Sequence, residues 1–306
     1  MEILKSLAEL KCNDKVALTI GNFDGVHLGH QQLLSDISTL SKRNNERLVV
    51  CTFTPHPKFI LQNTSNFLIN SYHERRNLLE ENGVKYLVEF EFNRDFSTQS
   101  PQEFLDNYIA ICSNLSSLYL GHDFAFGANK SGDHDFVKTY CMKNGINCFL
   151  EKEFVLDGNL KSSSTVIRQS LLDGKICDAN SLLGRNFYVQ GRVIKGQGRG
   201  KKIGFPTANI IFPNDRITPK RGVYKSSVTY NNMSYNSITN IGVNPTFGDG
   251  ALVNFETHIL DFDNDIYGEE IRVELSNFIR NEKKFSNVNE LIKQIKKDIL
   301  ATYDND

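Results

Sequence analysis

The first half of the chain alternates short apolar runs with amphipathic stretches. The runs are rich in branched and aromatic residues and predict β-strands at Val16–Phe23, Leu48–Thr54, Tyr86–Phe92, Leu118–Phe124 and Cys148–Val155. The stretches between them predict helices at Gln31–Leu40, Tyr72–Asn82 and Pro101–Ile111. Strands that alternate with helices predict an α/β fold, a Rossmann-like parallel sheet with helices on both faces. The ligand crevice of such a sheet lies beyond the carboxyl ends of its strands.

The pattern changes from about Asn186 onward, where turns separate most of the apolar runs. Strands are expected at Tyr188–Ile194, Val223–Tyr230, Met233–Ile238, Asn254–Leu260 and Glu270–Leu275. Several of them alternate apolar with polar residues, which predicts an antiparallel sheet or a small β-barrel. A terminal helix follows, with Asn287 as its cap, Glu290 at the third position, and an apolar stripe at Leu291, Ile295 and Ile299.

The length of 306 residues suits two domains rather than a single core. Two short helices, Ser164–Leu172 and Lys175–Leu183, are expected between the halves. The boundary is predicted at Leu183-Gly184-Arg185. It divides the chain into an N-terminal domain of residues 1–184 and a C-terminal domain of residues 185–306.

Composition and charge are ordinary for a soluble globular protein. The chain holds 35 basic and 36 acidic residues, so its net charge of -1 favours neither nucleic acid nor an anionic membrane as a partner. Its six cysteines lack metal-binding spacing, a pattern typical of reduced thiols in a cytoplasmic protein. The chain begins without a signal-peptide pattern, and no apolar run approaches the roughly 18 residues that span a bilayer. The oligomeric state stays open.

Residues 21–30, with the sequence GNFDGVHLGH, are the most informative segment. They lie between a predicted strand and a predicted helix, which indicates a glycine-rich turn leading into a helix N-terminus. His27 and His30 are three residues apart, so both side chains would project from one helix face. Free backbone N–H groups and the positive end of the helix dipole suit a bound phosphate. The pattern favours a polyphosphate site over a polar turn with two surface histidines.

Two segments of the second half imitate known binding loops. Residues 196–204, GQGRGKKIG, match neither phosphate-binding glycine motif in register, and taken alone they fit a flexible basic loop. Residues 261–265, DFDND, resemble the start of a calcium loop. However, Ile266 stands where that loop needs glycine and Arg272 where it needs glutamate. Calcium is therefore rejected, and an acidic turn is expected.

A series of motifs resembles the bacterial bifunctional riboflavin kinase/FMN adenylyltransferases, also called FAD synthetases. In the first half the motifs are residues 21–30, TFTPHP at 52–57, GHDFAFG at 121–127 and SSTVIR at 163–168. In the second half they are GFPTAN at 204–209, GVY at 222–224, NIGVNPTF at 240–247 and FETH at 255–258. The resemblance implies that the enzyme phosphorylates riboflavin to FMN with ATP. It then adenylylates FMN to FAD with release of pyrophosphate.

The resemblance makes residues 1–184 the FMN adenylyltransferase domain. His27 and His30 would donate hydrogen bonds to the α- and β-phosphate oxygens of ATP. Further ATP contacts are expected from Gly21, Phe23, Gly25, Gly29, Ser163, Ser164, Thr165 and Arg168. Flavin contacts are expected from Asn22, His56, Pro57 and Asp123.

Some of these positions have simpler interpretations. Ser163–Thr165 could simply cap a helix. His56 could be a surface histidine in an extended loop, and Asp123 could be a residue that favours a turn. Asp123 could equally bind ribose, flavin or metal. Ala125 departs from the family, which usually has a basic residue there, so a phosphate or flavin contact from that position is in doubt.

The resemblance makes residues 185–306 the riboflavin kinase domain. Thr207 and Asn209 would help to hold Mg²⁺ and the ATP phosphates, and oxygen ligands with phosphate suit this ion. Further ATP contacts are expected from Gly196, Gly198, Lys202, Gly204 and Pro206. Glu256, in a strand that turns Phe255 and Thr257 the other way, would accept the proton of the riboflavin 5′-hydroxyl. An exposed strand glutamate is the alternative.

Arg280 resembles a family arginine near the flavin, and a solvated charge is its alternative. Two rival functions also stay open. One is the same fold with a single working site, the adenylyltransferase being the weaker half because of Ala125. The other is a flavin-binding or regulatory protein without turnover, against which the intact motif residues argue.

Overall fold

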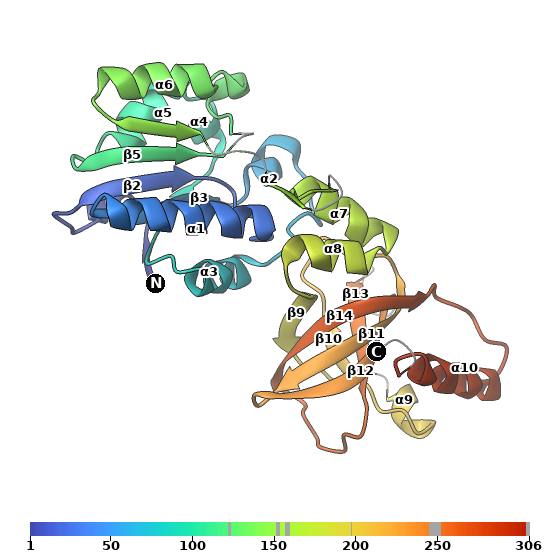
Figure 1. Ribbon diagram of the computed structural model, residues 1–306. Helices are drawn as coiled ribbons and strands as arrows, with labels where there is room; N and C mark the ends of the chain where they lie inside the picture. The colour runs from blue at the N-terminus through green and yellow to red at the C-terminus, as the bar shows by residue number, and fades with distance from the viewer. Residues whose placement is uncertain (122–123, 151–153, 157–159, 197, 245–251, 304–306) are drawn as a thin grey trace. The chain divides into compact units, whose positions relative to one another are not determined.

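The computed structural model describes residues 1–121, 124–150, 154–156, 160–196, 198–244 and 252–303 (Figure 1). They form two compact units, Met1–Ser163 and Ser164–Asp306. The first unit contains a parallel sheet, and the second contains two helices followed by an antiparallel barrel. No helix in the described part of the chain is long and apolar enough to cross a membrane.

The first unit is built on a six-stranded sheet in the order β1-β4-β3-β2-β5-β6. Its strands are β1 (Glu2–Leu4), β2 (Lys15–Ile20), β3 (Glu46–Thr54), β4 (Tyr86–Glu91), β5 (Leu115–Leu120) and β6 (Asn147–Leu150). All of their pairings are parallel, which confirms the predicted sheet. The chain runs outward from β2 in one direction through β3 and in the other through β5. Ligands of such sheets bind where the strand order reverses, beyond the carboxyl ends of the strands.

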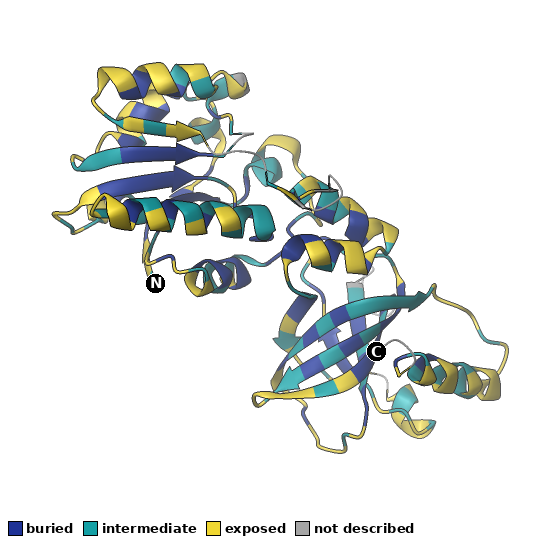
Figure 2. Cartoon of the chain, viewed as in Figure 1, coloured by how far each residue is buried: buried dark blue, intermediate teal, exposed yellow. Residues whose placement is uncertain are grey.

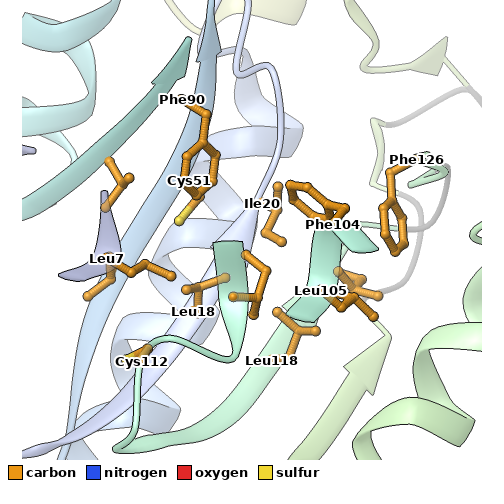
Figure 3. Packing of buried hydrophobic residues seen from close by; sticks show 14 of the residues in the cluster. Leu7, Leu18, Ile20, Cys51, Phe90, Phe104, Leu105, Cys112, Leu118 and Phe126 are labelled. Carbon is orange, nitrogen blue, oxygen red and sulfur yellow. The ribbon is translucent and has the colours of Figure 1, made fainter. Parts of the chain in front are cut away.

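Helices cover both faces of this sheet because its strands bury alternate residues on opposite sides. Val49, Cys51 and Phe53 of β3 belong to one apolar cluster, and Val50 belongs to another. Figure 3 shows the larger cluster, in which Phe104 lies near residues of the sheet. The helical segments are η1 (Leu7–Glu9), α1 (Leu28–Arg43), α2 (Pro57–Gln62), α3 (Tyr72–Glu81), α4 (Arg94–Ser97), α5 (Pro101–Phe104), the π-helical η2 (Leu105–Ile109), η3 (Ala128–Lys130) and α6 (His134–Lys143). A short antiparallel pair, β7 (Val155–Leu156) and β8 (Leu160–Lys161), follows β6.

The second unit is an antiparallel barrel with the strand order β10-β13-β12-β11-β14-β9. Its elements are α7 (Ser164–Asp173), α8 (Ile176–Leu183), β9 (Phe187–Arg192), α9 (Arg199–Lys202), β10 (Ala208–Ile211), β11 (Gly222–Tyr230), β12 (Met233–Asn244), β13 (Leu252–Ile259), β14 (Glu270–Arg280) and α10 (Val288–Leu300). An antiparallel bridge between Ile194 and Asn209 joins the two edges of the sheet, so the barrel is nearly closed. The predicted antiparallel barrel and terminal helix are confirmed, and Asn287 Oδ1 accepts the Glu290 N–H as its cap at 3.0 Å.

Alternation along the strands creates a buried barrel interior, visible in Figure 2 as dark bands on the strands. Phe255 and Thr257 of β13 are fully buried, whereas Glu256 between them is only partly buried. The predicted division of these three residues between two faces of the strand is therefore confirmed. Glu256 lies on the opposite, less buried face of the strand.

Helix α8 packs on the barrel through β9 and β14. Its buried positions include Ile176, Leu182 and Leu183. Asn180 reinforces the contact, since its Nδ2 donates to the Leu275 carbonyl at 2.8 Å. The division of the chain into compact units therefore falls before α7, whereas the sequence predicts the domain boundary after α8.

Candidate active sites

The loop between β2 and α1 folds into a compact turn that requires unusual backbone conformations. Phe23, Gly25 and Val26 have φ angles of 49°, 87° and 37°, all in the left-handed region. A branched residue such as Val26 seldom adopts this conformation, and such strain clusters at functional turns. Gln31 Nε2 stabilises the turn by donating to the Val26 carbonyl at 2.8 Å. A side chain at Gly25 would also approach Ile69 Cδ1 to 3.0 Å, so glycine is required there.

His27 and His30 lie at the start of α1, where the sequence places them. His27 is the extended residue that precedes the helix, and His30 lies in its first turn. Their rings are stacked, with centroids 3.7 Å apart and an interplanar angle of 20°. The Phe23 ring flanks His30 at 5.0 Å. His27 is only 6% exposed, so the surface-histidine alternative is wrong for this residue.

Ser162 joins the histidine pair from a distant part of the chain and is not among the predicted residues. Its Oγ accepts the Gly29 N–H at 3.2 Å and lies 3.1 Å from His27 Nδ1. A Cβ at Gly29 would lie 3.2 Å from both the His27 ring and the Ser162 carbonyl oxygen, which explains the glycine. The residue before the SSTVIR motif is therefore in contact with the HxGH motif.

A buried arginine on α3 ties together the carboxyl ends of β2 and β3. Arg75 is 2% exposed, and its Nη1 donates to the carbonyls of Asn22 at 3.1 Å and Phe53 at 3.3 Å. Its Nη2 donates to Thr54 Oγ1 at 3.0 Å and to Glu89 Oε1 at 3.1 Å. Burial lowers the pKa of the Arg75 guanidinium, and the neighbouring Glu89 carboxylate opposes that shift. The predicted flavin residue Asn22 is thus fixed through its backbone.

Two further contacts hold the same loop. The buried Asp24 carboxylate accepts the Ile69 N–H at 3.0 and 3.2 Å. Thr52 Oγ1 donates to the Asn22 carbonyl at 3.2 Å. The loop is therefore anchored from β3, from α3 and from the segment before α3, the kind of support that preorganises a binding site.

His56 caps α2 rather than lying on the surface. It is 5% exposed, and its Nδ1 accepts the Lys58 N–H at 3.2 Å. Its own backbone N–H donates to the Tyr72 hydroxyl at 2.8 Å, and its ring lies 5.0 Å from the ring of Phe67. The extended backbone predicted for His56 is present, but Pro57 begins a helix instead of continuing a loop. The surface-histidine alternative is wrong.

The other predicted adenylyltransferase residues are placed less directly. Ser163 ends the first compact unit, while Ser164, Thr165 and Arg168 lie in the first half of α7 in the second unit. Asp123 lies outside the described residues. Ala125 is described and exposed.

The barrel site gathers predicted residues from two paired strands. In the register of β10 and β13, Asn209 stands opposite Glu256. Asn209 Nδ2 donates to the Thr207 carbonyl at 3.3 Å, so the two predicted metal-binding residues are in contact. Asn254, which is not among the predicted residues, donates from Nδ2 to Asn209 Oδ1 at 2.9 Å and to Glu256 Oε1 at 3.4 Å.

The glycine-rich segment before β10 folds against this face. A Cβ at Gly196 would lie 2.5 Å from Asn209 Nδ2, and one at Gly200 would lie 2.3 Å from the Phe205 carbonyl oxygen. Gly198 and Gly204 have φ angles of 67° and 88°. The described part of this loop, with Lys202 at the end of α9, therefore has a defined conformation that glycine alone permits.

The end of the loop is pinned to β13. The Pro206 carbonyl oxygen lies 2.7 Å from His258 Nδ1, and the rings of Phe205 and His258 make an edge contact at 5.5 Å. These contacts place Pro206 beside the face of β13 that carries Glu256. The end of the loop is therefore in contact with β13.

Burial raises the pKa of the Glu256 carboxyl. The Asn254 hydrogen bond and the positive charge of Arg199 oppose this shift, and the negative charge of Glu282 adds to it. A carboxylate with a raised pKa is a stronger base than an ordinary one. The partly buried position also argues against a simple exposed strand glutamate.

Arg280 ends β14 and is bound to α10. Its guanidinium donates to both carboxylate oxygens of Asp298, at 2.7 to 3.0 Å, and Asp298 is only 2% exposed. Nη1 also donates to the Asn281 carbonyl at 3.0 Å. The solvated-charge alternative is wrong, because this bidentate pair fastens the terminal helix to the barrel.

Oxygen atoms dominate the barrel site, and this donor set fits Mg²⁺. Asn209 Oδ1, the Thr207 hydroxyl and the Glu256 carboxylate come from neighbouring positions. Within the described residues there is no group of three or more His, Cys, Asp or Glu side chains that could enclose a metal. Mg²⁺ seldom needs such a cage, since phosphates and water complete its coordination.

The fold and the two sites define a two-part enzyme that handles nucleotides in each part. The family model for FAD synthetase matches residues 9–165, and the model for riboflavin kinase matches residues 183–304. A bifunctional riboflavin kinase/FMN adenylyltransferase of Bacillus subtilis is 35% identical, over 93% of this chain and 90% of its own length. Its counterpart in Escherichia coli is also 35% identical, again over 93% of this chain and 90% of its own length.

The chain therefore belongs to the family of bifunctional riboflavin kinase/FMN adenylyltransferases. One solved structure matches the whole chain, with a TM-score of 0.89, 32% identity, and coverage of 100% of this chain and 99% of the other. That structure is described as a macrolide-efflux protein from Streptococcus pneumoniae. The match confirms the fold over the full length of the chain.

Proposed function

We propose that the protein carries out two consecutive reactions at two separate sites. The barrel site transfers the γ-phosphate of ATP to riboflavin and forms FMN. The parallel-sheet site transfers AMP from a second ATP to FMN and forms FAD and pyrophosphate. The observation that supports this most strongly is the presence of a preorganised site in each half of the chain, each within a matching family model.

In the kinase reaction, Glu256 accepts the proton of the riboflavin 5′-hydroxyl as its oxygen attacks the γ-phosphorus. The O–P bond forms while the bond to the β,γ-bridging oxygen breaks, and ADP leaves. The partly buried position and raised pKa of Glu256 support the role of base. Thr207 and Asn209 would hold Mg²⁺, which when bound neutralises phosphate charge. The loop with Gly196, Gly198, Lys202, Gly204 and Pro206 would cover the nucleotide.

In the adenylyl transfer, a phosphate oxygen of FMN attacks the α-phosphorus of ATP, and pyrophosphate leaves. The protein contributes mainly position and electrostatic stabilisation. His27 and His30 would donate to the phosphate oxygens at the positive end of α1, a helix of 16 residues. If the Ser162 hydroxyl donates its hydrogen bond to His27 Nδ1, the single N–H of the neutral His27 ring lies on Nε2, where it is available to phosphate. Arg168 would bind the β- and γ-phosphates.

The remaining assignments follow the family motifs. Gly21, Phe23, Gly25 and Gly29 would form the nucleotide-binding turn, with Ser163, Ser164 and Thr165 supplying hydroxyl groups. Asn22, His56, Pro57 and Asp123 would bind the flavin of FMN, and Arg280 would lie near riboflavin in the barrel. The fixed Asn22 backbone and the buried His56 support the flavin-binding assignment of these two residues.

We further propose that residues 1–184 act as the adenylyltransferase and residues 185–306 as the kinase. The SSTVIR motif supports an adenylyltransferase that extends beyond Ser163, even though α7 and α8 cluster with the barrel. A cytoplasmic location is also inferred, since the six cysteines are free thiols and both reactions use ATP. Fractionation with a specific antibody would test that location.

A single assay tests the two-site proposal. The purified chain is incubated with riboflavin, ATP and Mg²⁺, and the flavins are separated over time. FMN should appear first and FAD later, and omission of Mg²⁺ should stop the first step. FMN without FAD, even when FMN is supplied, would favour the rival with one working site. Bound but unchanged riboflavin would favour the flavin-binding rival.

A further inference from the structure

Asn254 lies at the centre of the barrel site although no motif marks it. It precedes Glu256 by two residues on β13 and therefore faces the same side of the strand. It is 9% exposed, and its Nδ2 donates to Asn209 Oδ1 at 2.9 Å and to Glu256 Oε1 at 3.4 Å. One amide group thus links the proposed base to the proposed metal-binding amide.

The orientation of this amide follows from its neighbours. Asn209 Nδ2 is used by the Thr207 carbonyl, so Asn209 presents its oxygen to Asn254. The Glu256 carboxylate can only accept. Both partners therefore require hydrogen atoms, and an amide nitrogen carries two of them. A hydroxyl or a carboxylate at position 254 could not supply both.

The side chain maintains these bonds at an energetic cost. Asn254 Oδ1 is buried, and the described residues provide it with no hydrogen-bond donor. Buried polar atoms are usually paired, and an unpaired one costs about 1–3 kcal/mol in proteins. An apolar residue of similar size would avoid this cost. The presence of an amide at this position points to a role for its donor group rather than to packing.

We propose that Asn254 is a positioning residue for phosphoryl transfer to riboflavin. Its two N–H groups hold the Glu256 carboxylate and the Asn209 amide oxygen in a fixed relation, so that the base and the phosphate-binding groups face the substrate together. The inference rests on the proposed roles of these two residues. Removal of a residue that orients the groups in direct contact with a metal or substrate typically lowers activity about 10–100-fold.

The test uses Asn254→Asp in the full-length chain, because aspartate keeps the shape and removes the donors. We expect kcat for riboflavin phosphorylation to fall at least about 10-fold, with KM for riboflavin within about threefold of the parent. Conversion of supplied FMN to FAD should stay within about twofold, because it takes place at the other site. Asn236→Asp, the same exchange at an exposed position of β12, is the matched control.

A double variant distinguishes positioning from a purely structural role. If Asn254 acts through Glu256, the loss in Glu256→Gln/Asn254→Asp should be at least about threefold smaller than the product of the two single losses. Multiplicative losses, or an unchanged kcat in a folded Asn254→Asp chain, would overturn the proposal.

Asn254→Leu is a second variant that tests folding. If both Asn254→Asp and Asn254→Leu lose cooperative unfolding, Asn254 serves stability, and the proposal is overturned as well. A parent chain that forms no FMN would refute the kinase assignment itself, which the same assay reveals separately.

Discussion

The two candidate sites differ in how the chain brings their residues together. At the parallel sheet, one continuous loop adopts left-handed conformations and leads into a stacked histidine pair at a helix N-terminus. At the barrel, side chains from β10 and β13 meet through strand register, and a glycine-rich loop folds over them. The first site depends on backbone conformation and the second on cross-strand pairing. Substitutions should therefore affect each site separately and by different mechanisms.

The largest expected effect is on the kinase side of this comparison. Glu256→Gln keeps the shape of the side chain and removes the base, so riboflavin phosphorylation should fall by about 10²–10⁴. Conversion of supplied FMN to FAD should be unchanged, as flavin separation would measure. A phosphorylation rate within about threefold of the parent, well under 1 kcal/mol of barrier, would show that Glu256 is not the base.

The histidine pair should show the reverse selectivity. His27→Ala or His30→Ala removes a transition-state contact to phosphate, so FAD formation should fall by about 10²–10³ while FMN accumulates. Time courses with riboflavin as the starting flavin would detect both effects. Equal loss of FMN synthesis in a folded variant would contradict two separate sites.

Fragments can sharpen the comparison by testing at which residue the kinase domain begins. Residues 164–306 should fold, phosphorylate riboflavin and fail to convert FMN to FAD. Residues 185–306 should retain kinase activity but unfold at least about 10 °C lower, since they lack α7 and also α8, which packs on the barrel. Each of its buried leucine and isoleucine side chains contributes roughly 1.5–3 kcal/mol. Thermal unfolding of both fragments would measure the difference, and equal midpoints would show that α8 does not stabilise the barrel.

Arg75 tests whether the loop at the first site depends on support from α3. Arg75→Lys keeps a positive charge but loses the guanidinium fork that reaches two carbonyls, a hydroxyl and a carboxylate. We expect about 1–3 kcal/mol of lost stability and a clear fall in FMN adenylylation. The kinase rate should be unchanged. Denaturant unfolding with both assays would check this, and the exposed Arg94→Lys is a matched control.

Ala125 should give the smallest effect. The family usually has a basic residue at this exposed position, so Ala125→Arg should increase the rate of FMN adenylylation by a few-fold and leave phosphorylation unchanged. KM for FMN and for ATP, measured separately, would show which substrate the new charge contacts. If neither constant changes, the lack of a basic residue at position 125 gives no reason to expect weak FMN adenylylation.

Local sequence determined the first site to a large extent. The residues that shape it, from Gly21 to His30, are consecutive, and turn chemistry, helix start and histidine spacing all act over a few positions. Strand–helix alternation likewise determined the parallel sheet, and alternation within strands determined the barrel. Element ends were less predictable: β2 ends at Ile20 rather than Phe23, because Phe23 has a positive φ.

Only the tertiary structure brought in Ser162, Arg75 and Asn254. Each acts on residues that sequence analysis had singled out, but the contacts of Ser162 and Arg75 cross long stretches of chain, and that of Asn254 depends on the pairing of β10 with β13. The short β10 was itself missed, since its first two residues belong to the proline-containing motif GFPTAN and its four residues carry too little pattern. Periodicity reports which face of a strand is buried, whereas register and long-range hydrogen bonds depend on which strands meet. That pairing is a property of the folded chain as a whole.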